Sequence, residues 1–183
     1  LGTVATGTID VLRRNAAEIS ARAGRDIVIE HVGARRDNPN CDTGDIRLSR
    51  DIFAVVEDPS VDIIVELIGG YEPAKELVLK AIANGKHVVT ANKALIAEHG
   101  NTIFAAAEAQ KVNVWFEAAV AGGIPIIKAL REGLSANKIQ WLAGIINGTG
   151  NFILSEMRDK GREFGDVLAD AQQLGYAEAD PTF

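Results

Sequence analysis

Apolar and polar positions along the chain follow two different periods. Between residues 8 and 23 apolar side chains recur at the spacing of one helix face. The same helical period returns over 71–86, over 92–111 and, after a turn, within 122–134. Gly100 is expected to divide or bend the third of these segments, because glycine weakens a helix interior. These stretches predict helices.

Short apolar runs rich in β-branched residues separate the helical stretches and predict strands. Four such runs cover residues 26–33, 61–70, 87–91 and 112–120. The run 61–70 is apolar almost throughout, which is typical of a strand buried on both faces. The polar segment 37–50 predicts a loop. Because the strands alternate with helices, the sequence indicates an α/β fold with a parallel, doubly wound sheet of the Rossmann type.

The alternation of strands and helices changes beyond Leu134. Residues 137–148 predict one more strand, and residues 149–160 and 163–174 predict two helices. We therefore predict a nucleotide-binding domain without its first strand, followed by a second, mixed α/β domain that is cut short. The predicted boundaries are 1–134 for the first domain and 135–183 for the second.

Composition excludes several classes of protein. The net charge of −6 argues against broad nucleic-acid binding, which needs a basic surface. No run reaches the roughly 18 apolar residues of a membrane span, and the start lacks the features of a signal peptide. Cys41 is the only cysteine, so an internal disulfide is impossible. These features fit a cytoplasmic protein without a membrane or nucleic-acid partner.

The opening residues "LGTVATG" are a candidate phosphate-binding turn. Gly2 and Ala5 fit the last two positions of the G-x-G-x-x-G/A pattern if a glycine precedes Leu1. The helix that follows would direct its first N–H groups at a pyrophosphate. An ordinary glycine-rich turn is the alternative.

The segment "GARRD" follows the strand predicted at 26–33. An acidic residue at this position usually binds the ribose 2′-hydroxyl of NAD, whereas arginine suits the 2′-phosphate of NADP. Arg35 and Arg36 favour NADP, and Asp37 leaves NAD open. A solvated basic pair is the alternative.

The segment "VVTANKALI" places polar residues where a strand ends and a helix begins. Thr90 ends the strand, Asn92 is a good N-cap, and Lys93 lies in the first helical turn. A cation in the first turn is opposed by the helix dipole, so Lys93 is a candidate for contact with a cofactor or a substrate carboxylate. A surface lysine is the alternative.

Two further segments carry candidate carboxylates. Glu117 precedes a glycine-rich bend whose carbonyl groups suit a hard cation, although a structural turn or a helix N-terminal carboxylate explains it as well. Glu178 and Asp180 lie close together near the end of the chain. They could bind an amine or be solvated.

Six motifs together resemble homoserine dehydrogenase, an NAD(P)-dependent enzyme of the aspartate pathway. They occur in the family's order across nearly the whole chain: "LGTVATG", "VELIGG", "TANKALIAEHG", "EAAVAGGIPII", "GIINGTGNFIL" and "LGYAEADPTF". The resemblance implies interconversion of L-homoserine and L-aspartate 4-semialdehyde by hydride transfer, within threonine, methionine and isoleucine biosynthesis. It also implies a homodimer or homotetramer with a small-molecule substrate, and it makes residues 135–183 the beginning of a catalytic and dimerisation domain.

The resemblance assigns roles to individual positions. The cofactor NADP or NAD is implied at Gly2, Thr3, Val4, Arg35, Thr90, Lys93, Gly175 and Glu178. A monovalent cation, expected to be sodium, is implied at Glu117 and the carbonyl groups of Val120, Gly122 and Ile124. Glu178 is also implied in binding the substrate amine, and Lys93 is the catalytic candidate within the chain.

The resemblance further implies that an Asp and a Lys that handle the substrate and its proton lie beyond Phe183, so we expect a chain truncated at both ends. Two alternatives stay open. One is a related semialdehyde or amino-acid dehydrogenase, although a thioester mechanism would need a nucleophilic cysteine and Cys41 is badly placed for it. The other is a regulatory module that binds NAD(P) without catalysis.

Overall fold

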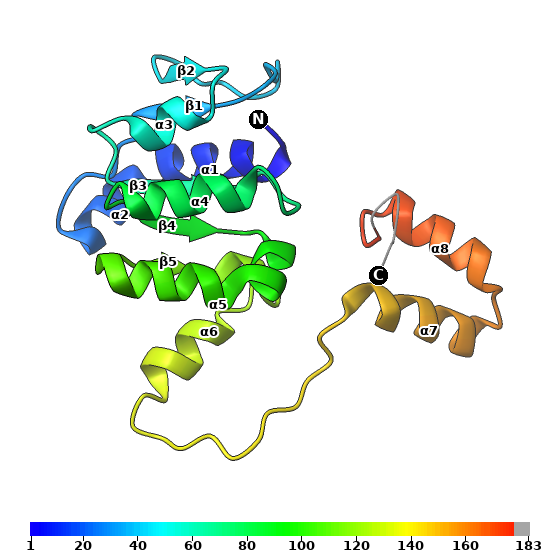
Figure 1. Ribbon diagram of the computed structural model, residues 1–183. Helices are drawn as coiled ribbons and strands as arrows, with labels where there is room; N and C mark the ends of the chain where they lie inside the picture. The colour runs from blue at the N-terminus through cyan, green and yellow to red at the C-terminus, as the bar shows by residue number, and fades with distance from the viewer. Residues whose placement is uncertain (178–183) are drawn as a thin grey trace. The chain divides into compact units, whose positions relative to one another are not determined.

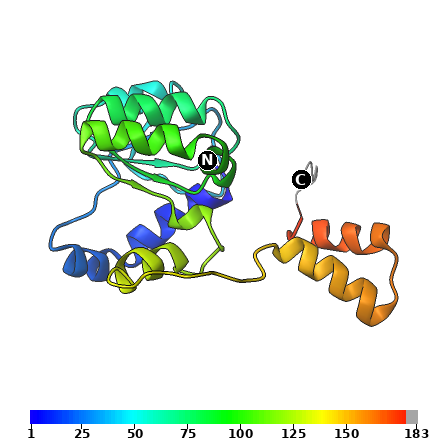
Figure 2. The ribbon, with the colours of Figure 1, turned by 60° about the horizontal axis from the view of Figure 1, so that its bottom comes forward.

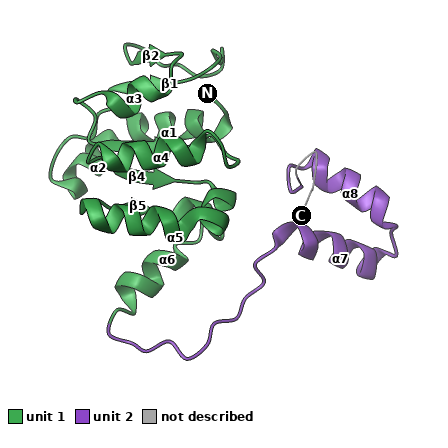
Figure 3. Cartoon of the chain, viewed as in Figure 1, with its two compact units in different colours: residues 1–135 green, residues 136–183 purple. Residues whose placement is uncertain are grey.

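The structure is a computed structural model in which residues 1–177 are described. The chain divides into two compact units, residues 1–135 and residues 136–183 (Figure 3). Each unit is described by itself below. Within residues 1–177 no helix is both long enough and apolar enough to cross a membrane.

The first unit is an α/β fold with parallel strands, as the sequence predicts. Its strands are β1 (His31–Gly33), β2 (Arg47–Ser49), β3 (Ile63–Glu66), β4 (His87–Thr90) and β5 (Val114–Trp115). Within residues 1–177 they form two parallel sheets, one of order β1-β2 and one of order β3-β4-β5. Because all pairs are parallel, the carboxyl ends of the paired strands meet at one edge of each sheet.

Helices connect these strands and lie on both sides of them. They are α1 (Thr3–Arg14), α2 (Ala16–Ala23), α3 (Phe53–Glu57), α4 (Ala74–Ala83), α5 (Lys93–Gln110) and α6 (Ile126–Lys128). A 3₁₀ turn, Glu117–Ala119, precedes α6, and a π-helical turn, Ala129–Gly133, follows it. Figure 2 shows α4 and α5 (green) on one side of the strands and α1 and α2 (blue) on the other.

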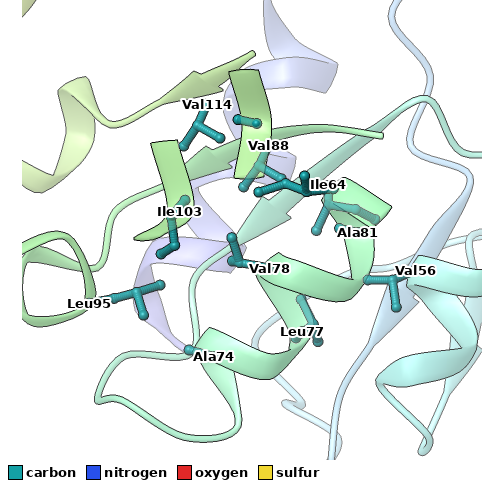
Figure 4. Packing of buried hydrophobic residues seen from close by; sticks show 12 residues of the cluster. Val56, Ile64, Ala74, Leu77, Val78, Ala81, Val88, Leu95, Ile103 and Val114 are labelled. Atoms are coloured by element: carbon teal, nitrogen blue, oxygen red, sulfur yellow. The ribbon is translucent and has the colours of Figure 1, made fainter. Parts of the chain in front are cut away.

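The core of the first unit lies where α4 and α5 pack on the β3-β4-β5 sheet (Figure 4). Val88, Leu95 and Ile103 are fully buried there. The two-sided burial predicted for 61–70 is wrong, because Ile63 and Val65 keep 43% and 45% of their surface exposed. Side chains alternate along a strand, so the face that carries Ile64 and Glu66 packs against α4 and α5, while Ile63 and Val65 lie on the opposite face.

Several predicted elements differ from the structure. The strand predicted at 26–33 is reduced to β1, and the loop predicted at 37–50 contains β2, which pairs with β1. Gly100 does not divide its helix, because α5 runs unbroken from Lys93 to Gln110 (Figure 1). Gly100 is buried instead, and a Cβ there would lie 3.3 Å from the ring of Phe104. Close packing thus accounts for this glycine without a break.

The second unit consists of an extended segment and two helices. These are α7 (Gly148–Lys160) and α8 (Phe164–Gln173), in agreement with the predicted helices, and they pack through Ile153, Val167 and Ala171. The strand predicted at 137–148 is wrong, since no strand forms there and Trp141 and Ile146 are 80% and 93% exposed. A strand needs a neighbour for its backbone hydrogen bonds, and residues 1–177 supply none for this segment.

Candidate functional site

The carboxyl ends of β3 and β4 bring together the first group of candidate residues. The register of the two strands pairs Glu66 with Thr90, the last residue of each strand. The Thr90 hydroxyl donates to Glu66 Oε2 at 2.6 Å and accepts from the Asn92 amide at 3.0 Å. Ligands of open α/β sheets bind at this edge, outside the carboxyl ends of the strands.

Asn92 connects this group to the helix that follows. Its side-chain Oδ1 accepts from the Leu95 amide at 3.1 Å, which makes it the N-cap of α5, as the sequence predicts. Its Nδ2 donates to the carbonyl of Gly70, at 2.7 Å, in the loop after β3. Lys93 is the first residue of α5. The hydrogen bonds of Asn92 connect this start of the helix to the end of β4 and to the loop after β3.

The N-terminus of α1 is open at its start. Gly2 is the N-cap, no side chain caps the helix, and its first turn carries no acidic residue. Thr3 and Val4 are exposed there. Asn38 Nδ2 donates to the carbonyl of Leu1 at 3.3 Å, which ties this start to the segment that follows β1. Uncapped N–H groups at a helix N-terminus suit an anion such as a phosphate.

The segment after β1 carries the charged residues that the sequence predicts to bind at the ribose 2′-position of the cofactor. Arg35 and Arg36 are exposed. Asp37 is held by Arg50, whose Nη2 lies 2.7 Å from both carboxylate oxygens, and Arg50 Nη1 donates to the carbonyl of Ala34 at 3.0 Å. The only acidic group in "GARRD" is thus paired with a guanidinium from the end of β2.

Glu117 is a helix N-terminal carboxylate in this structure. Its Oε1 accepts from the Ile127 amide at 2.9 Å and its Oε2 from the Lys128 amide at 2.7 Å. The bend between these residues includes Ala121 and Gly122 with φ of 55° and 59°. A carboxylate oxygen has more than one lone pair, so these bonds leave acceptor capacity for a cation.

The second unit places Gly175 beside the start of α7. Gly175 has φ of 76°, and the chain then folds back so that the Thr149 hydroxyl donates to the carbonyl of Tyr176. The rings of Phe152 and Tyr176 meet edge to face with centroids 5.2 Å apart. An open pocket is lined by Gly148, Thr149, Phe152 and Tyr176. Glu178 lies outside the described residues.

Comparison with known proteins decides the family. A family model for the homoserine dehydrogenase NAD-binding domain matches residues 1–117, and the model described as homoserine dehydrogenase matches residues 125–183. The chain belongs to the homoserine dehydrogenase family. The resemblance stated from the six motifs is thereby confirmed.

Relatives of known name extend over the whole chain. It is 71% identical over 183 residues to homoserine dehydrogenase of Pseudomonas aeruginosa. The aligned residues make up 100% of this chain and 42% of that protein. A crystal structure of a homoserine dehydrogenase from Thiobacillus denitrificans matches with a TM-score of 0.93 and 68% identity, over 100% of this chain and 43% of that one. A hyperthermophilic archaeal homoserine dehydrogenase in complex with NADPH matches with a TM-score of 0.66 and 27% identity, over 92% of this chain and 48% of that one. The chain thus spans less than half the length of these relatives.

For this member of the homoserine dehydrogenase family, the structure adds a residue that the sequence analysis misses. Glu66 is 2% exposed and is the last residue of β3. It lies beside Thr90, the last residue of β4, and next to the loop that follows β3. The sequence does contain one signal, since a carboxylate is costly inside an apolar run unless it has hydrogen-bond partners. The motif "VELIGG" therefore marks a position with a specific partner.

Proposed function

We propose that this chain is the cofactor-binding region and the first part of the catalytic region of a homoserine dehydrogenase. The reaction is the interconversion of L-homoserine and L-aspartate 4-semialdehyde with NADP or NAD. The observation that carries this proposal is the family match over both segments of the chain, with 71% identity to a named homoserine dehydrogenase. The open helix N-terminus and the ordered strand ends support it.

The cofactor's phosphates would lie at the start of α1. Gly2, Thr3 and Val4 would present backbone N–H groups to the pyrophosphate, where no side chain competes for them. A Cβ on Gly2 would meet no atom within 4 Å, so space for a ligand is open beside this turn. Arg35 would bind a 2′-phosphate. Because Arg50 pairs with Asp37 and offsets its negative charge, the segment that carries Arg35 suits the 2′-phosphate, which favours NADP.

Thr90 and Lys93 would face the reacting end of the cofactor. The bound nicotinamide supplies the hydride that reduces the aldehyde carbon. Lys93 would place a positive charge near the carbonyl oxygen or the substrate carboxylate, where negative charge is concentrated. Gly175 would contact the cofactor, and Glu178 would contact both the cofactor and the substrate amine. Reduction also needs a proton donor at the developing alkoxide, and we propose that this donor lies outside the residues of this chain.

A monovalent cation, proposed to be sodium, would be held by Glu117 and the carbonyl groups of Val120, Gly122 and Ile124. One carboxylate and several carbonyl groups are a donor set for a hard cation. The positive φ values of Ala121 and Gly122 reverse the chain so that carbonyl groups of the bend can converge. We further propose a cytoplasmic homodimer or homotetramer that acts in threonine and methionine biosynthesis.

A chimera tests the activity in a complete protein. This chain replaces the matching segment of the Pseudomonas aeruginosa relative, and homoserine-dependent reduction of NADP is followed by absorbance. We expect turnover comparable to that of the parent protein and loss of most turnover in the chimera with Lys93→Met. A folded chimera that binds NADPH but turns nothing over would instead support a regulatory module. One that uses a different semialdehyde would support a related dehydrogenase.

A further inference from the structure

Glu66 is a buried carboxylate to which no role has been assigned above. It is 2% exposed, and its partners are all at the carboxyl edge of the sheet. Oε2 accepts from the Thr90 hydroxyl at 2.6 Å, while Oε1 accepts from the amides of Ile68 and Gly69 at 2.7 and 3.3 Å. A buried charge is tolerated only with such bonds, and an apolar side chain would fill the same space without them.

These bonds belong to a closed ring that joins two loops. Glu66 holds the amides of the loop after β3, and that loop's Gly70 carbonyl accepts from Asn92. The backbone N–H of Asn92 donates to the Thr90 hydroxyl, and this hydroxyl donates to Glu66, which closes the ring. Glu66, Thr90 and Asn92 are 2%, 0% and 5% exposed, so the residues that supply side chains to the ring are shielded from water, while the loop residues 68–70 are exposed. Hydrogen bonds in a shielded network reinforce one another.

The loop held by this ring has little rigidity of its own. Gly69 and Gly70 have φ of 80° and 70°, a conformation that glycine adopts easily and other residues rarely adopt. A Cβ on either glycine would meet no atom within 4 Å, so the space beside the loop is open. A ligand beside this loop and the first turn of α5 would bind in one geometry only if hydrogen bonds from the buried side hold the loop backbone in place.

We propose that Glu66 is a positioning residue for the nicotinamide cofactor, fixing the loop 67–70 and the start of α5 so that the loop backbone and Lys93 meet the bound cofactor in one geometry. Glu66 itself does not touch the cofactor. The inference rests on the proposed function, because it assumes that this edge binds NADP or NAD.

A matched control lies at the opposite edge of the same sheet. Lys86 is 6% exposed and donates to the carbonyl groups of Asp58 and Val61 at 2.5 and 2.6 Å, just before β4. Its substitution removes a buried charge and its hydrogen bonds without touching the loops at the carboxyl edge. Lys86→Met therefore reports the effect of lost stability alone.

The experiment compares Glu66→Met and Lys86→Met in the chimera. NADPH affinity is measured by fluorescence titration well below the melting temperature, which is measured for each variant. We expect the NADPH Kd to rise about tenfold in Glu66→Met, because misplacing contact groups by an ångström is costly. Lys86→Met should melt at a lower temperature with an unchanged Kd.

A milder variant protects the test against misfolding. Glu66→Gln keeps the shape and one acceptor oxygen, so it should fold and raise the Kd by about threefold. The reference is the chimera without a substitution. If it binds NADPH and the folded Glu66→Gln and Glu66→Met variants bind NADPH with unchanged affinity, the inference about Glu66 is overturned and the proposed function is not. A reference chimera that binds no NADPH or NADH would overturn the proposed function as well.

Discussion

Two neighbouring arginines after β1 differ in what they are proposed to do. Arg35 is proposed to bind the 2′-phosphate of NADP, and Arg36 has the same charge and is also exposed. Arg35→Ala should raise the Kd of NADPH by about tenfold or more, since a hydrogen bond to a charged group is lost, and should change the Kd of NADH little. Arg36→Ala is the control and should change both affinities little. Equal losses for NADPH and NADH in Arg35→Ala, measured by titration, would show that Arg35 does not recognise the 2′-phosphate.

His31 gives the folded state a dependence on pH. Its side chain is 6% exposed, and Nδ1 lies 2.9 Å from Asp58 Oδ2. Burial lowers the pKa of His31 below its ordinary value of 6.5, and the positive charge of Arg47 lowers it further. The unfolded chain therefore takes up this proton at a higher pH than the folded chain does. The contribution of His31 is complete above pH 6.5 and is lost as the pH falls from 6.5 toward the lowered pKa.

The measurement is the free energy of unfolding by urea in the range from about pH 7.5 to about pH 5.5. The histidine should make stability fall on acidification with a slope of at most about 1.4 kcal/mol per pH unit. His31→Gln should lose this part of the slope. A variant with the same slope as the reference chain would contradict the assignment to His31.

Individual site residues are predictable where they end an element. Thr90 and Asn92 follow from the end of an apolar run and the start of a helical period, and the structure places them at the end of β4 and the N-cap of α5. Glu66 has partners that come from the sheet register and from loop amides, which no local pattern shows. The pairing of Asp37 with Arg50 is hidden in the same way, because it depends on β2 lying beside β1.

At the scale of elements, helices are more predictable than strands. The helices α4, α5, α7 and α8 have a local apolar period, and Asn92 and Asn147 cap α5 and α7, so the sequence contains most of what forms them. A strand depends on its neighbour. The short β2 forms in a polar segment because β1 lies beside it, whereas the apolar segment 137–148 forms no strand because residues 1–177 offer no partner.

The N-cap of α7 tests this dependence on local signals. Asn147 Oδ1 accepts from the Gly150 amide at 2.7 Å, and Asn151 lies one turn later on the exposed surface of the helix. Asn147→Ala should lower the stability of α7 by about 1 kcal/mol, because the first turn loses its cap. Asn151→Ala is the control and should leave it unchanged or slightly higher, since alanine is the better helix former. Hydrogen exchange of the α7 amides is the measurement, and equal exchange in the two variants would contradict the cap.

At the scale of the whole molecule, the two units have very different cores. The first unit buries a continuous cluster between two long helices and a sheet (Figure 4), whereas the second buries Ile153, Val167 and Ala171 between two helices. The two clusters share no residue. Apolar burial is the main favourable contribution to folding, so the second unit has much less to set against its conformational entropy.

This difference predicts that the two units of the 183-residue chain lose structure separately. Amides of α7 and α8 should exchange with solvent much faster than those of α4 and α5. Ile103→Ala removes a fully buried side chain from the first cluster and should destabilise that unit by about 2–5 kcal/mol. Because Ile103 belongs to the first cluster and not to the second, the exchange of α7 and α8 should not change. If Ile103→Ala accelerated exchange in all four helices alike, the chain would unfold as one cooperative body, and stability at the proposed cofactor edge would depend on both units.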